Sequence, residues 1–329
     1  MNARTAVVTA FAASGVVLSA AATHAVAANA NYPGRPIRFI MPYPVGGSID
    51  ISGRVVAQQL GENLGQQVVV DNRTGAGGTI GMEAGANAVP DGYTIVMGGT
   101  GTLAISPGLE RRLAYDPLKS FAPVTVLATT PYVLVAHPSL PAGSVKELIA
   151  LARAQPGKLN YASGGSGSAP HLIAEMFKAS AGLNIVHVPY KGSTPAVNEL
   201  MGGQVQMLFT GIPSVSPQLR AGRLKALGVT SARRSSSLPE VATIAESGVR
   251  GFDVSPWFGV LAPTRTPPVL VNRLNSEILK VLQAPTVRER LIRDGVDPVG
   301  NTPQEFTAFI RSELAKWSKV VKAAGVKVE

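Results

Sequence analysis

Short apolar runs, loops rich in glycine and amphipathic stretches follow one another along most of the chain. The first cycle is typical: Ile37–Met41 is apolar, Pro42–Ser48 interrupts it, and Ile51–Leu64 carries apolar residues near helical spacing. Runs rich in β-branched residues predict strands, and the periodic stretches predict helices. This order of strand, loop and helix indicates an α/β protein with a mainly parallel sheet covered by helices.

The same alternation continues to the C-terminus. The predicted strands are Ile37–Met41, Val68–Val70, Tyr93–Met97, Tyr132–Ala136, Leu159–Ala162, Ile185–Val188, Val205–Phe209, Leu224–Val229 and a run within Phe252–Ala262. The predicted helices are Ile51–Leu64, Ile80–Ala88, a helix capped by Ser144 that ends at Ala154, Pro170–Ala181, Pro195–Met201, Pro217–Ala221, Pro268–Gln283, Thr286–Asp294 and Pro303–Ala324.

The first thirty residues have the features of an export signal. Arg4 precedes the apolar stretch Ala6–Ala22, and two small-x-small sites, Ala25–Ala27 and Ala28–Ala30, follow it. This pattern predicts export and a cleaved signal peptide over residues 1–30, with cleavage after Ala27 or Ala30. A membrane anchor is the alternative, but the stretch is rich in Ala, Gly, Ser and Thr and therefore weak as a span.

The amino-acid composition excludes several kinds of functional site. The chain has 329 residues and no cysteine, which excludes a disulfide scaffold, a zinc site with cysteine ligands and thiol catalysis. Its 30 Lys and Arg against 20 Asp and Glu give a net charge of +10, but these charges are dispersed and no nucleic-acid-binding module accompanies them. We therefore expect no nucleic-acid partner, and the charge favours attraction of small anions.

Six loops follow predicted strands and precede predicted helices. They are rich in Gly, Ser and Thr, and they are Tyr43–Asp50, Asn72–Gly78, Gly98–Thr102, Ser163–His171, Tyr190–Thr194 and Thr210–Ser214. In open α/β sheets, ligands bind at the carboxyl ends of strands, where helix N-termini present free N–H groups to an anion. Ordinary turn chemistry explains any one of these loops, but all six together favour a ligand cleft.

The sequence motifs of other kinds of functional site are incomplete or absent. Gly75–Gly81 nearly matches the dinucleotide fingerprint, but Ile80 occupies its last glycine position, and no phosphate-binding loop is present. The histidines form no metal-binding motif, so we expect neither a metal nor a cofactor. A serine hydrolase using Ser163, Ser166 or Ser168 with His171 remains an alternative, although the nucleophile-elbow motif is absent.

A series of longer motifs is spread along the chain from about residue 31 to residue 329. They are Tyr32–Arg38, Pro42–Asp50, Asp71–Gly78, Pro90–Thr94, Tyr115–Pro117, Val135–Leu140, Gly157–Ser163, His187–Gly192 and Trp257–Gly259. In these motifs the chain resembles the Bug-type substrate-binding proteins of tripartite tricarboxylate transporters.

The resemblance implies a periplasmic-binding-protein-like (Venus flytrap) α/β fold with two doubly wound lobes. Lobe 1 would comprise residues 31–131 and 255–329, and lobe 2 residues 132–254. The chain would cross between lobes near Thr130–Tyr132 and Val254–Pro256. The implied protein is a monomeric receptor, not an enzyme, that binds a small organic carboxylate and delivers it to membrane transporter subunits. A receptor feeding a signalling partner is the alternative.

The family's two ligand loops correspond to Tyr43–Ser48 and to Ser163–Ser168 with His171 beyond. Asp50 is predicted either to cap its helix or to contact the ligand. Combined with the loop argument, this gives the candidate ligand-binding residues Tyr43, Val45, Gly46, Gly47, Ser48, Asp50, Gly77, Thr100, Ser163, Gly165, Ser168, His171, Tyr190 and Thr210.

The chain departs from the family pattern at two pairs of residues. Thr210 and Gly211 stand where many members have Asp and Asn, and Leu103 and Ser106 stand where a His and an Asn are frequent. A lost carboxylate in the cleft would weaken the recognition of amino groups. The sequence therefore favours a plain carboxylate ligand or an uncharged moiety.

Overall fold

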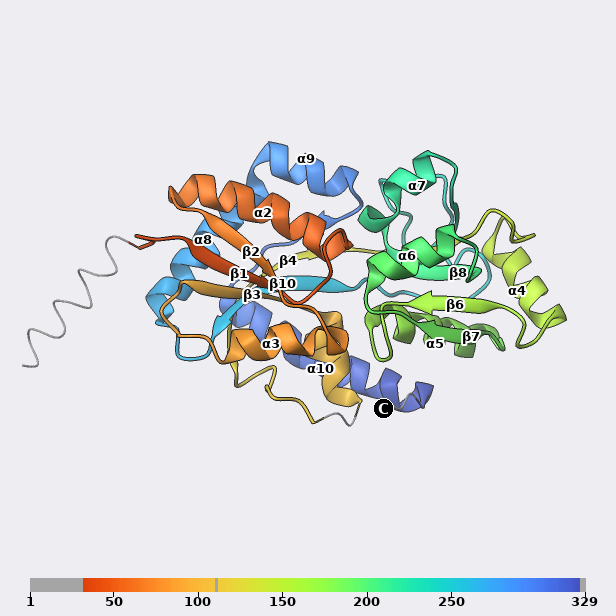
Figure 1. Ribbon diagram of the computed structural model, residues 1–329, viewed down its shortest axis with the longest axis horizontal. Helices are drawn as coiled ribbons and strands as arrows, with labels where there is room; N and C mark the ends of the chain where they lie inside the picture. Colours follow the sequence, from red (N-terminus) through yellow and green to blue (C-terminus); the bar gives the residue numbers. More distant parts are fainter. Residues whose placement is uncertain (1–31, 110–111, 326–329) are drawn as a thin grey trace, which may run out of the picture.

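The computed structural model describes residues 32–109 and 112–325, which form two mixed β-sheets covered by helices (Figure 1). The six-stranded sheet has the order β11-β4-β10-β3-β1-β2, and the five-stranded sheet has the order β7-β6-β8-β5-β9. The predicted signal peptide lies outside the described residues. Within residues 32–109 and 112–325, no helix is long and apolar enough to cross a membrane.

The first sheet takes its strands from both ends of the chain: β1 (Ile37–Met41), β2 (Val68–Asn72), β3 (Thr94–Gly99), β4 (Phe121–Thr129), β10 (Trp257–Pro263) and β11 (Asp297–Pro298). Its α-helices are α2 (Ser48–Leu64), α3 (Thr79–Ala86), α8 (Pro268–Gln283), α9 (Pro285–Arg293) and α10 (Pro303–Ala324). Short helical segments are η1 (Ala76–Gly78), η2 (Thr100–Ile105, a π-helix) and η3 (Ser106–Gly108).

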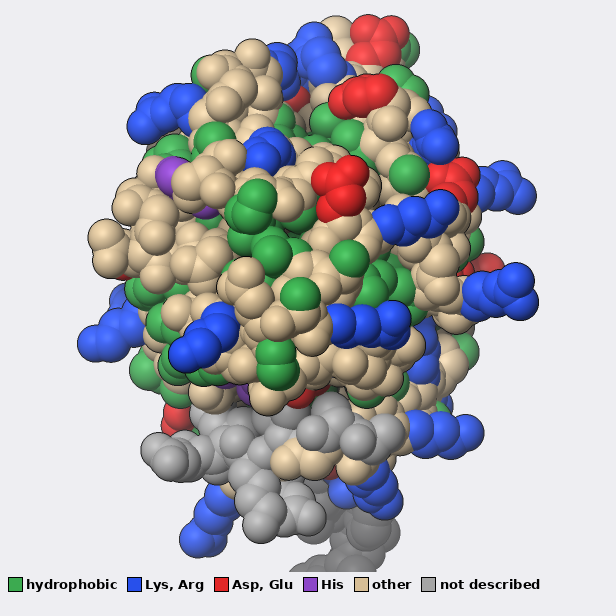
Figure 2. Space-filling view, turned by 90° about the vertical axis from the view of Figure 1, so that its right-hand side faces the viewer, with side chains coloured by type: hydrophobic (Ala, Val, Ile, Leu, Met, Phe, Trp, Pro, Cys, Tyr) green, Lys and Arg blue, Asp and Glu red, His purple; other side chains and the backbone are tan. Residues whose placement is uncertain are grey.

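The second sheet takes its strands from the middle of the chain: β5 (Tyr132–Ala136), β6 (Asn160–Ser163), β7 (Val186–Pro189), β8 (Met207–Gly211) and β9 (Lys225–Val229). Its helices are α4 (Val145–Ala154), α5 (Ala169–Ala181), α6 (Ser193–Met201), α7 (Ser216–Arg220) and the 3₁₀ turn η4 (Ile212–Ser214). Lys and Arg side chains are scattered over the outer face of this half of the molecule (Figure 2).

Local sequence explains where several helices begin. The Ser144 hydroxyl accepts a hydrogen bond from the Glu147 amide at the start of α4. Thr302 and Glu305 form a reciprocal capping box at the start of α10. Both caps satisfy N–H groups that a helix terminus otherwise leaves free.

Two crossover segments join the sheets and lie side by side. The first follows β4 and the second precedes β10. The Thr130 amide donates to the Pro256 carbonyl at 2.8 Å, and the Thr230 hydroxyl bridges the Tyr132 amide and the Val254 carbonyl at 2.8 and 2.6 Å. The two passages between the sheets are therefore tied to each other.

The prediction of mainly parallel sheets was wrong. β10 runs antiparallel to β3 and β4, and β5 runs antiparallel to β8 and β9. Both strands follow directly on a crossover segment, so each enters its sheet from the side of the other sheet. That direction depends on long-range connectivity, which the local alternation of strand and helix does not carry.

The strand β4 was not predicted, although it lies inside the first sheet. Pro123 interrupts its sequence, and proline is normally excluded from inner strands. The structure accommodates Pro123 opposite Leu261, where the register between β4 and β10 shifts. A second difference concerns Gly98–Thr102, predicted as a loop, which instead ends β3 and begins the π-helix η2.

Helix α10 packs against both halves of the molecule, on η2 and β4 of the first and on α5 of the second. Its buried Glu313 accepts hydrogen bonds from the indoles of Trp257 and Trp317 at 2.8 and 3.0 Å. These are the chain's two tryptophans, and Trp257 begins β10 immediately after the second crossover.

We predict that Glu313→Leu lowers the free energy of unfolding by about 2 kcal/mol or more, because it leaves two buried indole N–H groups without an acceptor. Glu313→Gln keeps an oxygen acceptor and should cost about 1 kcal/mol or less. Urea unfolding followed by tryptophan fluorescence measures both. Equal losses for Leu and Gln would contradict the proposed role of the shared acceptor.

Candidate functional site

A cavity of about 770 Å³ lies between the two sheets and is lined by residues from both. Five of the six predicted loops contribute to its wall, and only Thr210–Ser214 does not. The crossover segments and the strands that follow them contribute Tyr132, Pro256 and Trp257. The cavity is therefore bordered by both halves and by the segments that connect them.

The wall from the first half contains the N-terminus of α2. Gly47, Ser48 and Ile49 line the cavity, and Gly47 caps the helix without a side-chain hydrogen bond. A seventeen-residue helix whose first N–H groups have no side-chain cap presents hydrogen-bond donors and a partial positive charge there.

The opposite wall contains the N-terminus of α5, where Ala169 and Pro170 line the cavity. The preceding residue, Ser168, donates its hydroxyl to the Gly165 carbonyl at 2.7 Å and makes no side-chain cap. Two helix N-termini from different halves of the molecule thus border the same space. This arrangement suits a ligand with negative charge at both ends.

Tyrosine side chains form much of the remaining wall. Tyr43 lies 3.3 Å from Thr102, hydroxyl to hydroxyl, and burial raises the pKa of Tyr43 to about 12. Burial also raises the pKa of Tyr132. Both phenols are therefore neutral at physiological pH and can offer a hydrogen bond or an aromatic face without adding charge.

Charge on the cavity wall has one sign. Lys191 is the single charged side chain among the described lining residues, and it is exposed. No Asp or Glu stands among those residues. An anion therefore meets two helix N-termini and one ammonium group, and no carboxylate in the described wall repels it.

Eight predicted site residues line the cavity: Tyr43, Gly47, Ser48, Gly77, Thr100, Gly165, Ser168 and Tyr190. The hydroxyl of Thr100 is already engaged, because it accepts from the Trp257 amide at 2.9 Å and donates to the Trp257 carbonyl at 3.4 Å. It ties the end of β3 to the second crossover.

Six predicted residues do not line the cavity: Val45, Gly46, Asp50, Ser163, His171 and Thr210. The side chain of Val45 is exposed, and that of Thr210 is buried within β8. Asp50, buried on α2, accepts from the Gly46 amide at 3.0 Å and pairs with Arg54 at 3.0 Å. It fixes the loop ahead of α2 from behind, which favours its structural role over ligand contact.

Ser163 and His171 do not form the pair that a hydrolase would need. The Ser163 hydroxyl lies 2.6 Å from His187 Nε2, while His171 Nδ1 accepts from the Gly167 amide at 3.0 Å. Ser163 is fully buried behind the wall. A serine nucleophile must reach its substrate, so this arrangement argues against Ser163 as the nucleophile of a hydrolase.

Several lining residues were absent from the predicted set, among them Tyr132, Trp257, Lys191 and Gly192. Tyr132 and Trp257 stand at the predicted crossovers, where a cleft must be lined. That position was the signal that could have identified them. Gly192 becomes recognisable only from the contact that it makes across the cavity.

That contact joins the two halves at the edge of the cavity. A Cβ atom on Gly192, which has φ +116°, would lie 2.2 Å from Pro44 Cγ. Beside it, the Thr194 hydroxyl donates to the Val45 carbonyl at 2.9 Å. The halves therefore meet in close contact, and a glycine is required for them to approach this far.

The family model described as the tripartite tricarboxylate transporter family receptor matches residues 52–326. The chain belongs to this family. It is 40% identical over 316 residues to protein BugT of Bordetella pertussis, covering 96% of this chain and 97% of that protein. It is also 42% identical over 291 residues to a UPF0065 protein of Pseudomonas sp. strain P51, covering 88% and 86% of the two chains.

Solved structures agree with this assignment. R. palustris Rpa4515 with adipate is 38% identical, with a TM-score of 0.88 over 90% of this chain and 99% of that one. MatC from Rhodopseudomonas palustris with bound malate is 31% identical, with a TM-score of 0.83 over 88% and 100%. The periplasmic binding protein BugD is 34% identical, with a TM-score of 0.86 over 91% of this chain and 100% of that one.

These comparisons confirm the predicted family and the periplasmic-binding-protein-like α/β fold. Members of this family are substrate-binding receptors and not enzymes. The cavity between the sheets is accordingly a candidate binding site and not a candidate active site.

Proposed function

We propose that this chain binds a small organic carboxylate in the cavity between two lobes, residues 31–131 with 255–329 and residues 132–254. The main supporting observation is the composition of the cavity wall. Helix N-termini without side-chain caps face the cavity from both sides, and Lys191 is the one charged side chain among the described lining residues. The similar proteins solved with adipate and with malate support this ligand class.

In this proposal, one carboxylate accepts hydrogen bonds from the first turn of α2 and from Ser48. The far end of the ligand meets the first turn of α5 and Lys191 on the opposite wall. A ligand that contacts both lobes binds the closed form better than the open form, and so shifts the equilibrium toward closure. Thr210 lies outside the lining, so the proposed anion selectivity depends on the wall residues and not on that substitution.

We further propose that residues 1–30 direct export to the periplasm, where the receptor passes its ligand to integral membrane transporter subunits. The family description, which names a transporter receptor, supports this role. Deleting the gene should abolish uptake of the bound carboxylate by cells, and re-expression should restore it. A signalling receptor would instead leave uptake unchanged and alter a transcriptional or motility response.

Ligand binding should stabilise the protein against heat. At a ligand concentration about 100 times Kd, binding adds about 2.7 kcal/mol to the free energy of unfolding, which a thermal-shift assay detects. We expect adipate, malate or a related carboxylate to raise Tm, and the corresponding diamines to leave it unchanged. If no carboxylate raises Tm or changes the tryptophan fluorescence, the proposed ligand class is wrong.

Gly192→Ala should weaken carboxylate binding about tenfold or more, because the new Cβ would occupy the space of Pro44 and hold the lobes apart. Isothermal titration calorimetry measures the affinity. Gly182→Ala is the matched control, since Gly182 also has a positive φ (+63°) but no heavy atom within 4 Å of the added Cβ. Equal effects of the two substitutions would show that backbone strain, and not closure, limits binding.

A further inference from the structure

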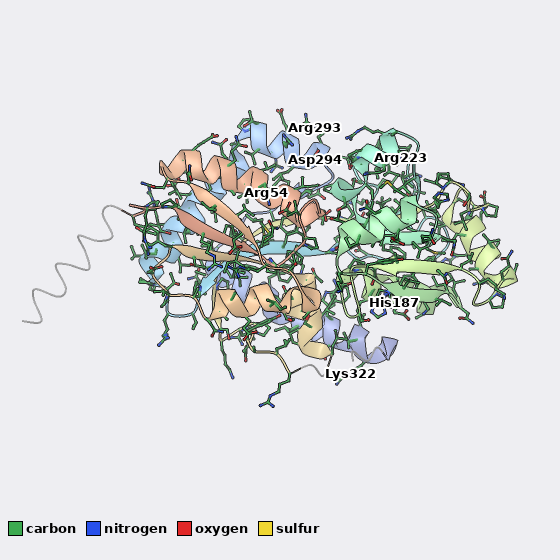
Figure 3. The ribbon with its side chains drawn as sticks, in the orientation of Figure 1. Arg54, His187, Arg223, Arg293, Asp294 and Lys322 are labelled. Carbon is green, nitrogen blue, oxygen red and sulfur yellow. The ribbon has the colours of Figure 1, made fainter. Side chains whose placement is uncertain are left out.

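A cluster of aromatic and titratable side chains lies behind the second-half wall, outside the cavity lining. The imidazoles of His171 and His187 stack with their centroids 3.9 Å apart and their planes within 7°. Tyr161 stacks on His187 at 4.9 Å. His187 belongs to β7, where Figure 3 labels it, and His171 to the first turn of α5.

Both histidines connect to the loop that forms the wall. His171 Nδ1 accepts a hydrogen bond from the Gly167 amide at 3.0 Å. His187 Nε2 lies 2.6 Å from the Ser163 hydroxyl, which also accepts from the Gly165 amide at 3.1 Å. Gly165 and its neighbours Gly164, Ser166 and Ser168 line the cavity, so the histidines hold the wall from behind.

The hydrogen bond from the Gly167 amide requires His171 Nδ1 to carry no proton, whereas the Ser163 hydroxyl can donate either to His187 Nε2 or to the Gly165 carbonyl at 3.1 Å. A proton on His171 Nδ1 would place two N–H groups against each other where the Gly167 hydrogen bond now lies. Two parallel imidazoles in contact cannot both carry charge without strong repulsion. Burial lowers the pKa of His171, and burial together with His171 lowers the pKa of His187 to about 4.

The charged groups that act on the pair both belong to α5. Glu175 lies 3.9 Å from His171 Nε2 and favours protonation, whereas Lys178, 2.7 Å from Glu175, opposes it. Tyr161 on β6 donates its hydroxyl to Glu175. Glu175 already pairs with Lys178 and Tyr161, so its charge is largely compensated before a proton is added to the stack.

We propose that His171 and His187 are positioning residues that keep the Gly164–Ser168 wall in its binding form only while both rings are neutral, so that acid releases the ligand. The inference rests on the proposed function for its ligand but concerns a part of the protein that the ligand does not touch. Its consequence is that the receptor loads at neutral pH and loses affinity in strongly acidic surroundings.

The sign of the effect follows from the lowered pKa values. An unfolded chain protonates histidine near pH 6.5, whereas the folded chain does so only at lower pH. The stabilising contribution is therefore complete above pH about 6.5 and is lost as the pH falls toward about 4, the folded value of His187. Affinity should fall in the same direction, but only as the folded rings take up protons, which for His187 is centred on about pH 4.

The first test measures Kd for adipate and malate between pH 7.5 and pH 4 in three proteins. The double variant His171→Asn with His187→Gln keeps a side-chain hydrogen-bonding group near each ring nitrogen that now makes a hydrogen bond, and it removes both titrating imidazoles. His137→Asn changes a partly exposed histidine that contacts Ser139 and serves as the matched control. Ligand protonation affects all three proteins equally, so the comparison between proteins cancels it.

We expect Kd of the wild type and of His137→Asn to rise about twofold more than that of the double variant by pH 4, where a group with a pKa of about 4 is half protonated. Parallel pH profiles in all three proteins would overturn the proposal. Failure of every carboxylate to bind at pH 7.5 would instead overturn the proposed function.

A second measurement needs no ligand. Hydrogen exchange of the peptide containing Gly165 and Gly167 should accelerate at pH 4 in the wild type relative to the double variant at the same pH. Equal exchange in the two proteins would show that protonation does not loosen the wall. This result would reject the inference whether or not a carboxylate binds.

Discussion

The paired crossover segments are the constraint on which the rest of the structure depends. The chain passes between the sheets twice, and the hydrogen bond from the Thr130 amide to the Pro256 carbonyl holds the two passages together. The end of β4 and the start of β10 lie side by side where the first sheet meets the crossovers. The loops at that end of the first sheet therefore face those of the second sheet. Thr100 joins this junction to the wall through its hydrogen bonds with Trp257.

Polar side chains behind the cavity shape the backbone that faces it. Asp50 anchors the loop before α2, and Ser163 anchors the loop before α5 through the Gly165 amide. Both are buried, and neither lines the cavity. The wall can then present mostly neutral amides and hydroxyls to an anion, with Lys191 as the one charged side chain in its described lining.

Structural features that are determined by residues close together in the chain could be predicted from the sequence. Alternating patterns located five of the loops that line the cavity, and Ser144 and Thr302 marked helix starts that the structure confirms. Strand direction and the inner strand containing Pro123 were missed, since both depend on partners distant in the chain. Ser163 was placed near the site, but its inward orientation depends on His187, which the fold brings beside it.

The wall of the second half behaves as one unit, which links closure to the histidine stack. β6 and β7 pair in parallel, and beyond them the Tyr190 amide donates to the Ser163 carbonyl at 3.1 Å. The strand that carries His187 therefore leads directly into the turn containing Gly192, which meets Pro44 across the cavity. We therefore expect a change at the stack to act on both the Gly164–Ser168 loop and the Gly192–Pro44 contact, which is how a proton there would oppose ligand binding without touching the ligand.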